Sequence, residues 1–469
     1  MSPRALIVAY DFPPHGAIGT MRTLRLVREL SHEGWDVAVL TGAPETYSPG
    51  TPVDERLEAQ VPAGVRVIRA RAFRGLDAIA RTTVRVRSAK AVAKPEPADG
   101  AVERPRSPRA LMRLKDWVDA VCSIPDKESG WIAPAMLRGI AYMVFSGRPD
   151  VIYSSAPPWS GQVVAWILAA LSRRPWVADF RDPWARAPWR DWGRPFRQRA
   201  AAVLERRVVG RADAILFVTG ANMGEFSRHY GAERSERFYL VPNGCDPVEL
   251  AAIEARPTMD PFVLLHAGTL YGARNPLPVV EAVARAIASG ALDPARFRLR
   301  FLGSVSLSID LPAACRRLGL EGVVEFVPRV TRAESLRALK SASALLLVQT
   351  GTTLSVPGKA YEYLAAGRPI LALSEEGETA DLVRASGIGR SVSPSAPLGN
   401  VESALLEVVS LATMPYTAPP RELYDGVVHA RTTARLLAHY AEHGRRLVPA
   451  SHLALRSAGT GTPLEETRR

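Results

Sequence analysis

The stretch ALIVAYDFPPHGAIGTMRTLRLVRELSHEGWDVAVLTG (residues 5–42) decides the fold. An apolar run over residues 5–10 leads through a Pro- and Gly-rich loop into an amphipathic helix over residues 21–34, and a second apolar run follows over residues 36–42. Two continuous apolar strands joined through a helix pair in parallel, in a sheet with both faces covered. The stretch therefore predicts a βαβ unit of a doubly wound α/β fold.

The same alternation of apolar strands and helices continues in two series. The first series continues with strands expected within residues 65–72, 149–158, 175–184 and 212–220. The second series has strands expected within residues 261–270, 297–304, 322–330, 343–350, 369–374 and 387–392. Because 469 residues exceed what one core normally holds, we predict two doubly wound domains in tandem.

The limits of these domains follow from where the alternation stops. We predict an N-terminal Rossmann-like domain over residues 1–246 and a C-terminal one over residues 260–418, with the linker within residues 243–260. Residues 84–110 lose all periodicity and are rich in Pro, Ala and charge, which predicts a flexible insertion.

The C-terminal end of the chain carries one more helical pattern. Residues 419–445 contain a helix that closes the fold and that we expect to return to the N-terminal domain. Residues 446–469 have the composition of a disordered tail.

Composition indicates an ordinary globular protein of the cytoplasm. The chain is 47% hydrophobic and 23% charged, and its three cysteines have no CxxC or metal-ligand spacing, so we expect a reduced, cytoplasmic protein. No apolar stretch reaches the length of about 18 residues that a membrane-spanning helix needs.

The formal charge of +13 suits an anionic partner. The basic residues are spread along the chain, so we expect no nucleic acid, although Trp and Arg alternate over residues 173–207. Peripheral association with the inner face of an anionic membrane and general arginine richness remain as alternative explanations of the charge.

Loops at strand ends hold the first candidate residues, because doubly wound sheets bind ligands outside the carboxyl ends of their strands. Gly16 and Gly19 precede a helix, where their backbone N–H groups would approach an anion or a sugar, unless the loop is a plain turn. His15 and Arg22 flank these glycines. Arg181 and Asp182 directly follow an apolar strand, which favours a binding site over a structural ion-pair hub.

Two cations in the second series stand near the starts of helices. Lys359, in VPGKAYEYLAAGRPIL (residues 356–371), falls in a first helical turn, where the helix dipole is unfavourable for a cation. Arg274 follows Gly268 at the start of another helix. Two such cations suggest a shared anion, such as a diphosphate, with Glu362 either accepting hydrogen bonds from a ribose or capping the first turn.

Other catalytic signatures are absent from the sequence. We find no acidic or histidine spacing typical of a metal site, no GxSxG and no Cys/His nucleophile pattern. We therefore expect no metal and no cofactor, and a transfer reaction stabilised by fixed cations and helix dipoles.

The motifs together resemble glycosyltransferase family 4, over nearly the whole chain. The resemblance rests on residues 10–30, IPDKESGW (124–131), PDVIYSSAPP (149–158), PWVADFRDPW (175–184), VPNGCD (241–246), HAGTLYGARNP (266–276) and residues 357–371. It is strongest to a subgroup of bacterial polysaccharide and glycoconjugate loci. It implies retaining enzymes with the GT-B architecture, two doubly wound Rossmann-like domains facing a cleft, that use nucleotide-sugar donors.

The resemblance also assigns residues to the donor. It implies that Gly16, Gly19 and Gly268 approach the donor, that Arg274 contacts its diphosphate, and that Glu362 is the second Glu of the family's Glu-x7-Glu motif, associated with the ribose. The family's first Glu falls at Leu354 and its Arg after the glycine falls at Thr269, so this chain lacks both. Lys359 would replace the missing cation.

The acceptor side is assigned to the N-terminal domain, with His15, Arg22, Arg181 and Asp182 as candidates. Arg181 stands where several family members have a cleft histidine. We expect catalysis by Arg274 and Lys359, with Asp182 as the candidate base, and a saccharide or a lipid-linked acceptor. A nucleotide-sugar epimerase or hydrolase, or a noncatalytic binding homologue, remains an alternative.

Overall fold

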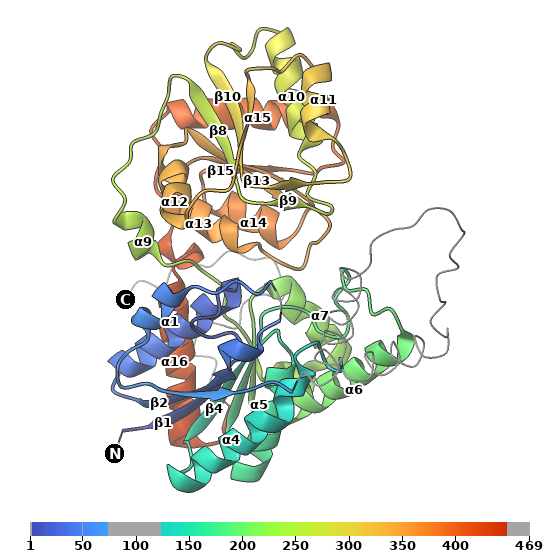
Figure 1. The fold of residues 1–469 in the computed structure, drawn as a ribbon. Coiled ribbons are helices and arrows are strands. Elements are labelled where there is room, and N and C mark those ends of the chain that lie inside the picture. The colour runs from blue at the N-terminus through green and yellow to red at the C-terminus, as the bar shows by residue number, and fades with distance from the viewer. Residues whose placement is uncertain (1, 49, 74–122, 448–469) are drawn as a thin grey trace, which may run out of the picture. The chain divides into compact units, whose positions relative to one another are not determined.

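The computed structural model describes residues 2–48, 50–73 and 123–447 (Figure 1). The chain forms two compact units, the first comprising Met1–Leu216 and Ala434–Val448 and the second running from Phe217 to Thr433. The expected insertion at residues 84–110 lies outside the described residues, as do residues 448–469 of the expected tail. The domain limits given above remain a prediction.

The first large sheet has seven strands in the order β3-β2-β1-β4-β5-β6-β7. Its strands are β1 (Arg4–Val8), β2 (Asp36–Gly42), β3 (Arg66–Ala70), β4 (Val151–Ala156), β5 (Trp176–Phe180), β6 (Ala214–Phe217) and β7 (Phe238–Leu240). Its associated helices are α1 (Ile18–His32), α4 (Ile132–Phe145), α5 (Ser160–Ser172), α6 (Pro195–Arg211), α7 (Gly220–Tyr230) and α8 (Ala232–Ser235). β1 pairs in parallel with both β2 and β4, so the βαβ prediction is confirmed and the strand order reverses beside β1.

The second large sheet has six strands in the order β12-β10-β8-β13-β14-β15. They are β8 (Phe262–Ala267), β10 (Phe297–Leu302), β12 (Val324–Val327), β13 (Ala344–Gln349), β14 (Ile370–Ser374) and β15 (Gly389–Val392), and a small parallel pair is formed by β9 (Leu270–Tyr271) and β11 (Val305–Ser306). The helices that follow along this part of the chain are α9 (Pro247–Ala251), α10 (Leu277–Ala288), α11 (Leu311–Arg317), α12 (Arg332–Ser341), α13 (Gly358–Ala366), α14 (Glu378–Ala385), α15 (Leu398–Thr413) and α16 (Gly426–His443). Here the order reverses between β8 and β13, which places a ligand-binding crevice at their carboxyl ends.

Both faces of the second sheet are covered by helices. Leu264 and Leu346 belong to one buried cluster, whereas Leu265 and Leu345 belong to another. Successive residues of a strand point to opposite faces, so the two clusters lie on the two sides of the sheet. This explains why the central strands are continuous apolar runs.

The expected linker is more ordered than a bare connection. It contains α9, whose Leu250 is buried in the core of the second unit. In α16, the part from Ala434 onward belongs to the first unit, where the hydroxyl of Tyr440 donates to the carbonyl of Asp213 at 2.9 Å. None of the helices in the described ranges combines the length and apolar character needed to cross a membrane.

Candidate functional site

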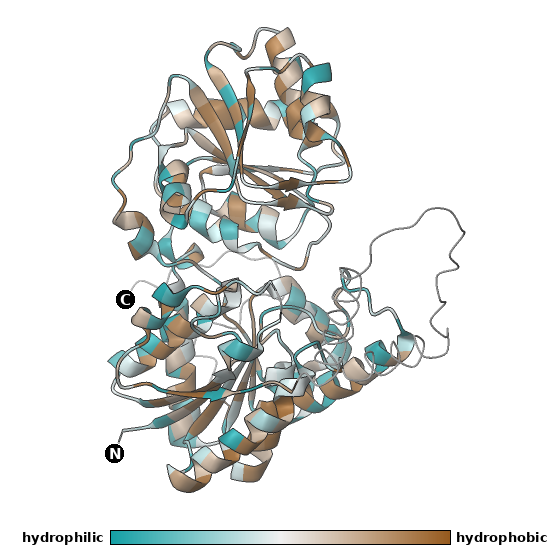
Figure 2. Ribbon diagram, viewed as in Figure 1, coloured by the Kyte–Doolittle hydropathy of each residue, from teal (hydrophilic) through white to brown (hydrophobic). Residues whose placement is uncertain are grey.

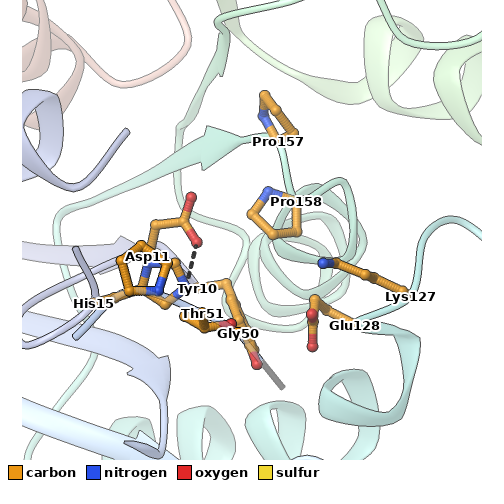
Figure 3. Close-up of a pocket in the computed structure, with 10 residues that line it drawn as sticks. Tyr10, Asp11, His15, Gly50, Thr51, Lys127, Glu128, Pro157 and Pro158 are labelled. Carbon is orange, nitrogen blue, oxygen red and sulfur yellow. Dashed lines mark ion pairs between the residues drawn. The ribbon is translucent and has the colours of Figure 1, made fainter. Parts of the chain in front are cut away.

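A pocket of about 340 Å³ opens at the carboxyl edge of the first sheet (Figure 3). Its walls come from the loops after β1 and β4, from the loop after β2 and from the segment before α4. The lining residues are Tyr10, Asp11, His15, Gly50, Thr51, Pro52, Lys127, Glu128, Pro157 and Pro158. Asp11 and His15 lie on one wall, and Lys127 and Glu128 lie on the opposite wall (Figure 3). Of these residues, sequence reasoning singled out only His15.

His15 is neutral and is held by its own loop. Its Nδ1 accepts a hydrogen bond from the N–H of Ala17 at 3.3 Å, so the ring proton is on Nε2, which lies 3.5 Å from the carboxylate of Asp11. Burial lowers the pKa of His15, although Asp11 and Glu128 oppose this shift. His15 therefore presents an N–H to Asp11 rather than a positive charge to a ligand.

The two glycines of this loop serve protein contacts. The N–H of Gly16 donates to the carbonyl of Pro52 at 2.8 Å, so it already has an acceptor within the protein. Gly19 lies inside α1, where a Cβ would overlap the guanidinium of Arg181. Glycine at position 19 thus lets Arg181 lie against the first turn of α1. The donor-binding role of both glycines stays a prediction.

Arg181 and Asp182 do not pair with each other through a hydrogen bond. The guanidinium of Arg181 bonds to the carbonyl of Pro157 and lies 3.5 Å from the carboxylate of Asp11. The carboxylate of Asp182 accepts no hydrogen bond from any described residue. Burial raises the pKa of Asp182, and Arg181 opposes the shift. The structure thus leaves Asp182 as a desolvated carboxyl group directly after β5.

Arg22 occupies a different place from the one expected. Only 8% of Arg22 is exposed, and its Nε and Nη2 donate to the two oxygens of Asp179 at 2.7 and 3.0 Å. The hydroxyl of Tyr153 also donates to Asp179, at 2.6 Å. The charge of Arg22 is therefore compensated inside the protein, and its role at the acceptor stays a prediction. The structural ion-pair hub exists, but it is built on Asp179, inside β5, rather than on Arg181 and Asp182.

Asp126 organises the wall that carries Lys127 and Glu128. Its carboxylate accepts hydrogen bonds from the N–H and hydroxyl of Ser160 at 2.8 and 2.7 Å, and from the N–H of Glu128 at 2.9 Å. It therefore caps α5, whose own N-cap residue Trp159 provides no capping bond. Sequence reasoning missed this role, although a charged PDKE segment between apolar stretches was its signal.

In the second unit, Lys359 lies in the first turn of α13 against Gly268, which follows β8. Gly268 has a φ of +127°, and a Cβ there would overlap Nζ of Lys359. Among the described residues, Nζ has no hydrogen-bond acceptor and no ion pair. Burial lowers the pKa of Lys359 to about 8, with a further contribution from Arg274, while Glu362 opposes it. The two cations that the sequence singled out thus lie near enough for the charge of Arg274 to lower the pKa of Lys359.

Arg274 reaches this site from the loop before α10. Its guanidinium lies 4.6 Å from the ring centroid of Tyr271, a cation–π arrangement that steadies a half-exposed side chain. The helix begins only at Leu277, so Arg274 precedes the first turn instead of standing in it. Thr269, in the same loop, is exposed.

Sequence reasoning missed His266, which lies beneath these cations. Its ring is buried in β8, and Nδ1 donates to the carbonyl of Leu346 at 2.9 Å. Burial, with Lys359 and Arg274, lowers the pKa of His266 to about 3, so the ring is neutral. Its Nε2 is buried without a hydrogen-bond partner in the described chain. A histidine inside an otherwise apolar strand was the available signal.

Glu362 forms an ion pair and does not cap α13. One of its oxygens lies 2.9 Å from Arg332, which also pairs with Glu249 at 2.7 Å. The next residue, Tyr363, accepts a hydrogen bond from the N–H of Ala267 at 2.8 Å and so fixes α13 to the end of β8. Glu362 is therefore held in a defined position on the exposed side of α13.

Within residues 2–48, 50–73 and 123–447, no cluster of three or more His, Cys, Asp or Glu side chains is placed to hold a metal ion.

One comparison with known proteins covers the N-terminal half of the chain. Residues 19–244 match a family model described as a glycosyl transferase 4-like domain. No curated protein matches the chain in sequence.

Solved structures resemble the chain over almost its full length. A sucrose-phosphate synthase from Thermosynechococcus elongatus is 14% identical with a TM-score of 0.57, covering 95% of this chain and 100% of its own. Anabaena HepE in complex with UDP and glucose is also 14% identical, with a TM-score of 0.56, covering 93% and 99%. The lipopolysaccharide outer core galactosyltransferase WaaB is 12% identical with a TM-score of 0.54, covering 94% and 100%.

The chain has the GT-B fold. The glycosyl transferase 4-like match over residues 19–244 agrees with this fold.

Proposed function

We propose that this protein is a retaining glycosyltransferase that moves a sugar from a nucleotide-diphosphate sugar to a hydroxyl acceptor. The observation that carries the proposal is Lys359, a desolvated cation at the start of α13 with Arg274 beside it. A helix N-terminus and two cations form a site for a diphosphate. The fold is shared with Anabaena HepE, which was solved with UDP and with UDP-glucose, and this supports a nucleotide-sugar donor.

The proposed reaction needs no protein nucleophile. The bond between the anomeric carbon and the phosphate oxygen breaks, and the acceptor oxygen bonds to that carbon on the same face of the sugar. Arg274, Lys359 and the N–H groups of α13 stabilise the charge that develops on the leaving diphosphate. The proton of the acceptor hydroxyl passes to a leaving phosphate oxygen; where a protein base takes it instead, Asp182 is the candidate. The reaction requires no metal.

The acceptor is proposed to be a saccharide, a lipid-linked glycan or a small glycoconjugate. The pocket of the first unit supports this class, because Asp11 on one wall and Lys127 and Glu128 on the other offer hydrogen-bond acceptors and donors to the hydroxyl groups of a sugar ring. A lipid-linked acceptor would also accord with peripheral association at an anionic membrane.

The direct test screens nucleoside diphosphates for a rise in melting temperature and then supplies labelled nucleotide sugars with saccharide or lipid acceptors. Transfer of label to an acceptor with the anomeric configuration of the donor supports the proposal. Turnover without an acceptor assigns hydrolysis or epimerisation instead. Binding without turnover on any acceptor assigns a noncatalytic homologue.

Arg332 gives a prediction about the ribose contact. If Glu362 binds the ribose, Arg332→Ala removes the ion pair that holds the Glu362 carboxylate in position. Binding of a nucleoside diphosphate should then weaken by about twofold to fivefold, as expected for a half-exposed ion pair. Calorimetry with the 2′-deoxy analogue should show a smaller loss. An equal loss for both nucleotides would contradict a ribose contact by Glu362.

A further inference from the structure

Helix α4 exposes an apolar face that the proposed function does not use. Leu137, Val144 and Phe145 are 68%, 70% and 87% exposed. The only charged residue in this helix of 14 residues is Arg138, and α4 is coloured predominantly hydrophobic in Figure 2. Exposed apolar side chains are common singly, but three large ones on one short helix mark an interaction surface.

Two of the exposed side chains share one face of the helix. Leu137 and Val144 are seven residues apart, the spacing of a single face, and Phe145 is exposed beside them as the last residue of the helix, whereas Ala135, Gly139 and Tyr142 are buried on the opposite face. At 1.5 Å per residue the helix is about 21 Å long, which is too short to cross a bilayer. A helix with these properties lies along an interface, with its apolar side immersed.

The end of α5 extends this surface. α4 packs on α5, as a Cβ at Gly139 would contact Leu168, and Leu171, one turn further along α5, is also exposed. Both helices lead directly into strands, α4 into β4 and α5 into β5. The surface therefore lies at the amino edge of the first sheet, while the pocket lies at the carboxyl edge.

A rim of arginines surrounds this apolar surface. Residues 129–149 and 160–178 contain no Asp or Glu. The arginines around the helix ends are Arg138, Arg148, Arg173 and Arg174, joined by Arg4 and Arg66, which both donate to Ser146 just after α4. The acidic groups there are Asp36, 3.2 Å from Arg4, Asp150, 3.9 Å from Arg174, and Asp213, which accepts from the N–H of Trp176 and lies 3.6 Å from Arg445. The arginines outnumber these acids, so the rim is positive.

We propose that the exposed face of α4 and the end of α5 form a docking surface for a membrane with anionic headgroups. The apolar side chains enter the boundary between headgroups and acyl chains, and the arginines bind the lipid phosphates. A second copy of the chain fits less well, because two arginine rims would face each other across a symmetric contact. This proposal does not depend on glycosyl transfer.

Co-sedimentation with vesicles tests the proposal. The full chain should bind vesicles that contain phosphatidylglycerol at low salt, bind vesicles of phosphatidylcholine alone far less, and lose binding as salt is added. The double variant V144E/F145E should bind at least about tenfold more weakly, because it loses two apolar side chains that the bound membrane would bury. The matched control is V248E on α9, which changes a valine of similar exposure, 67%, and should bind like the wild type.

A second variant guards against a folding defect. Arg138→Glu with Arg148→Glu changes two exposed side chains, and it should remove the salt-dependent part of binding while the unfolding midpoint stays at the wild-type value. The proposal is overturned if the wild type does not bind phosphatidylglycerol vesicles at low salt, or if both α4 variants bind as well as V248E. A wild-type dimer in sedimentation velocity that V144E/F145E dissociates would assign the surface to a second copy and equally overturn it.

Discussion

Replacing Asp179 by alanine is expected to lower the free energy of unfolding by about 3–5 kcal/mol. Asp179 is completely buried, and its two oxygens bond the guanidinium of Arg22 at 2.7 and 3.0 Å. Removing one member of a buried ion pair leaves the other charge desolvated and uncompensated, and Tyr153 also loses its acceptor. Urea denaturation followed by tryptophan fluorescence measures the loss, because Trp176 lies in the same strand.

The matched control is the nearby acid that has no such bonds. Asp182→Ala removes a carboxyl group whose pKa burial already raises, so stability should fall little or rise. Adding Arg22→Met to Asp179→Ala should recover part of the loss, since it removes the unpaired charge while Tyr153 still lacks its acceptor. A loss below about 1 kcal/mol in Asp179→Ala would contradict a stabilising hub at this position.

Periodicity predicted the strands and helices because buried parallel strands are continuous apolar runs. Residues 5–42 gave β1, α1 and β2 in the correct order, and the runs of the second series became the six strands of its sheet. The loop at residues 243–260 was less predictable. Its composition is that of a linker, but α9 is short and gains its stability by burying Leu250 in the core.

The sequence singled out candidate residues where a charged side chain is unfavourable in its predicted local structure. Lys359 and Arg274 stood out because cations near helix starts are locally unfavourable, and the structure places them together. The ion pair of Arg22 was not predicted, because its partner, Asp179, is 157 positions away along the chain and only the folded sheet brings them together. The capping role of Asp126 was not predicted for the same reason, since the helix that it caps begins 34 residues later.

Replacing Lys359 by alanine is expected to weaken binding of a nucleoside diphosphate by about 1.5–3 kcal/mol, which corresponds to about tenfold to a hundredfold in Kd. The ammonium group is desolvated beside Gly268, so a diphosphate there would gain a charge-assisted bond that little water screens. Isothermal titration calorimetry with the nucleoside diphosphate and with the nucleoside alone measures the change. The loss should appear only for the diphosphate.

The control for long-range charge is Arg337→Ala, which removes a positive charge from the exposed side of α12 in the same unit and should leave the affinity unchanged.

The pH dependence adds an independent check. The pKa of Lys359 is about 8 without ligand, so the cation is present below that pH and is lost as pH rises through it. A bound diphosphate favours the charged form, so affinity should fall as pH increases above about 8 in the wild type and less in Lys359→Ala. Unchanged affinity in Lys359→Ala, or identical pH profiles, would contradict a diphosphate at the start of α13.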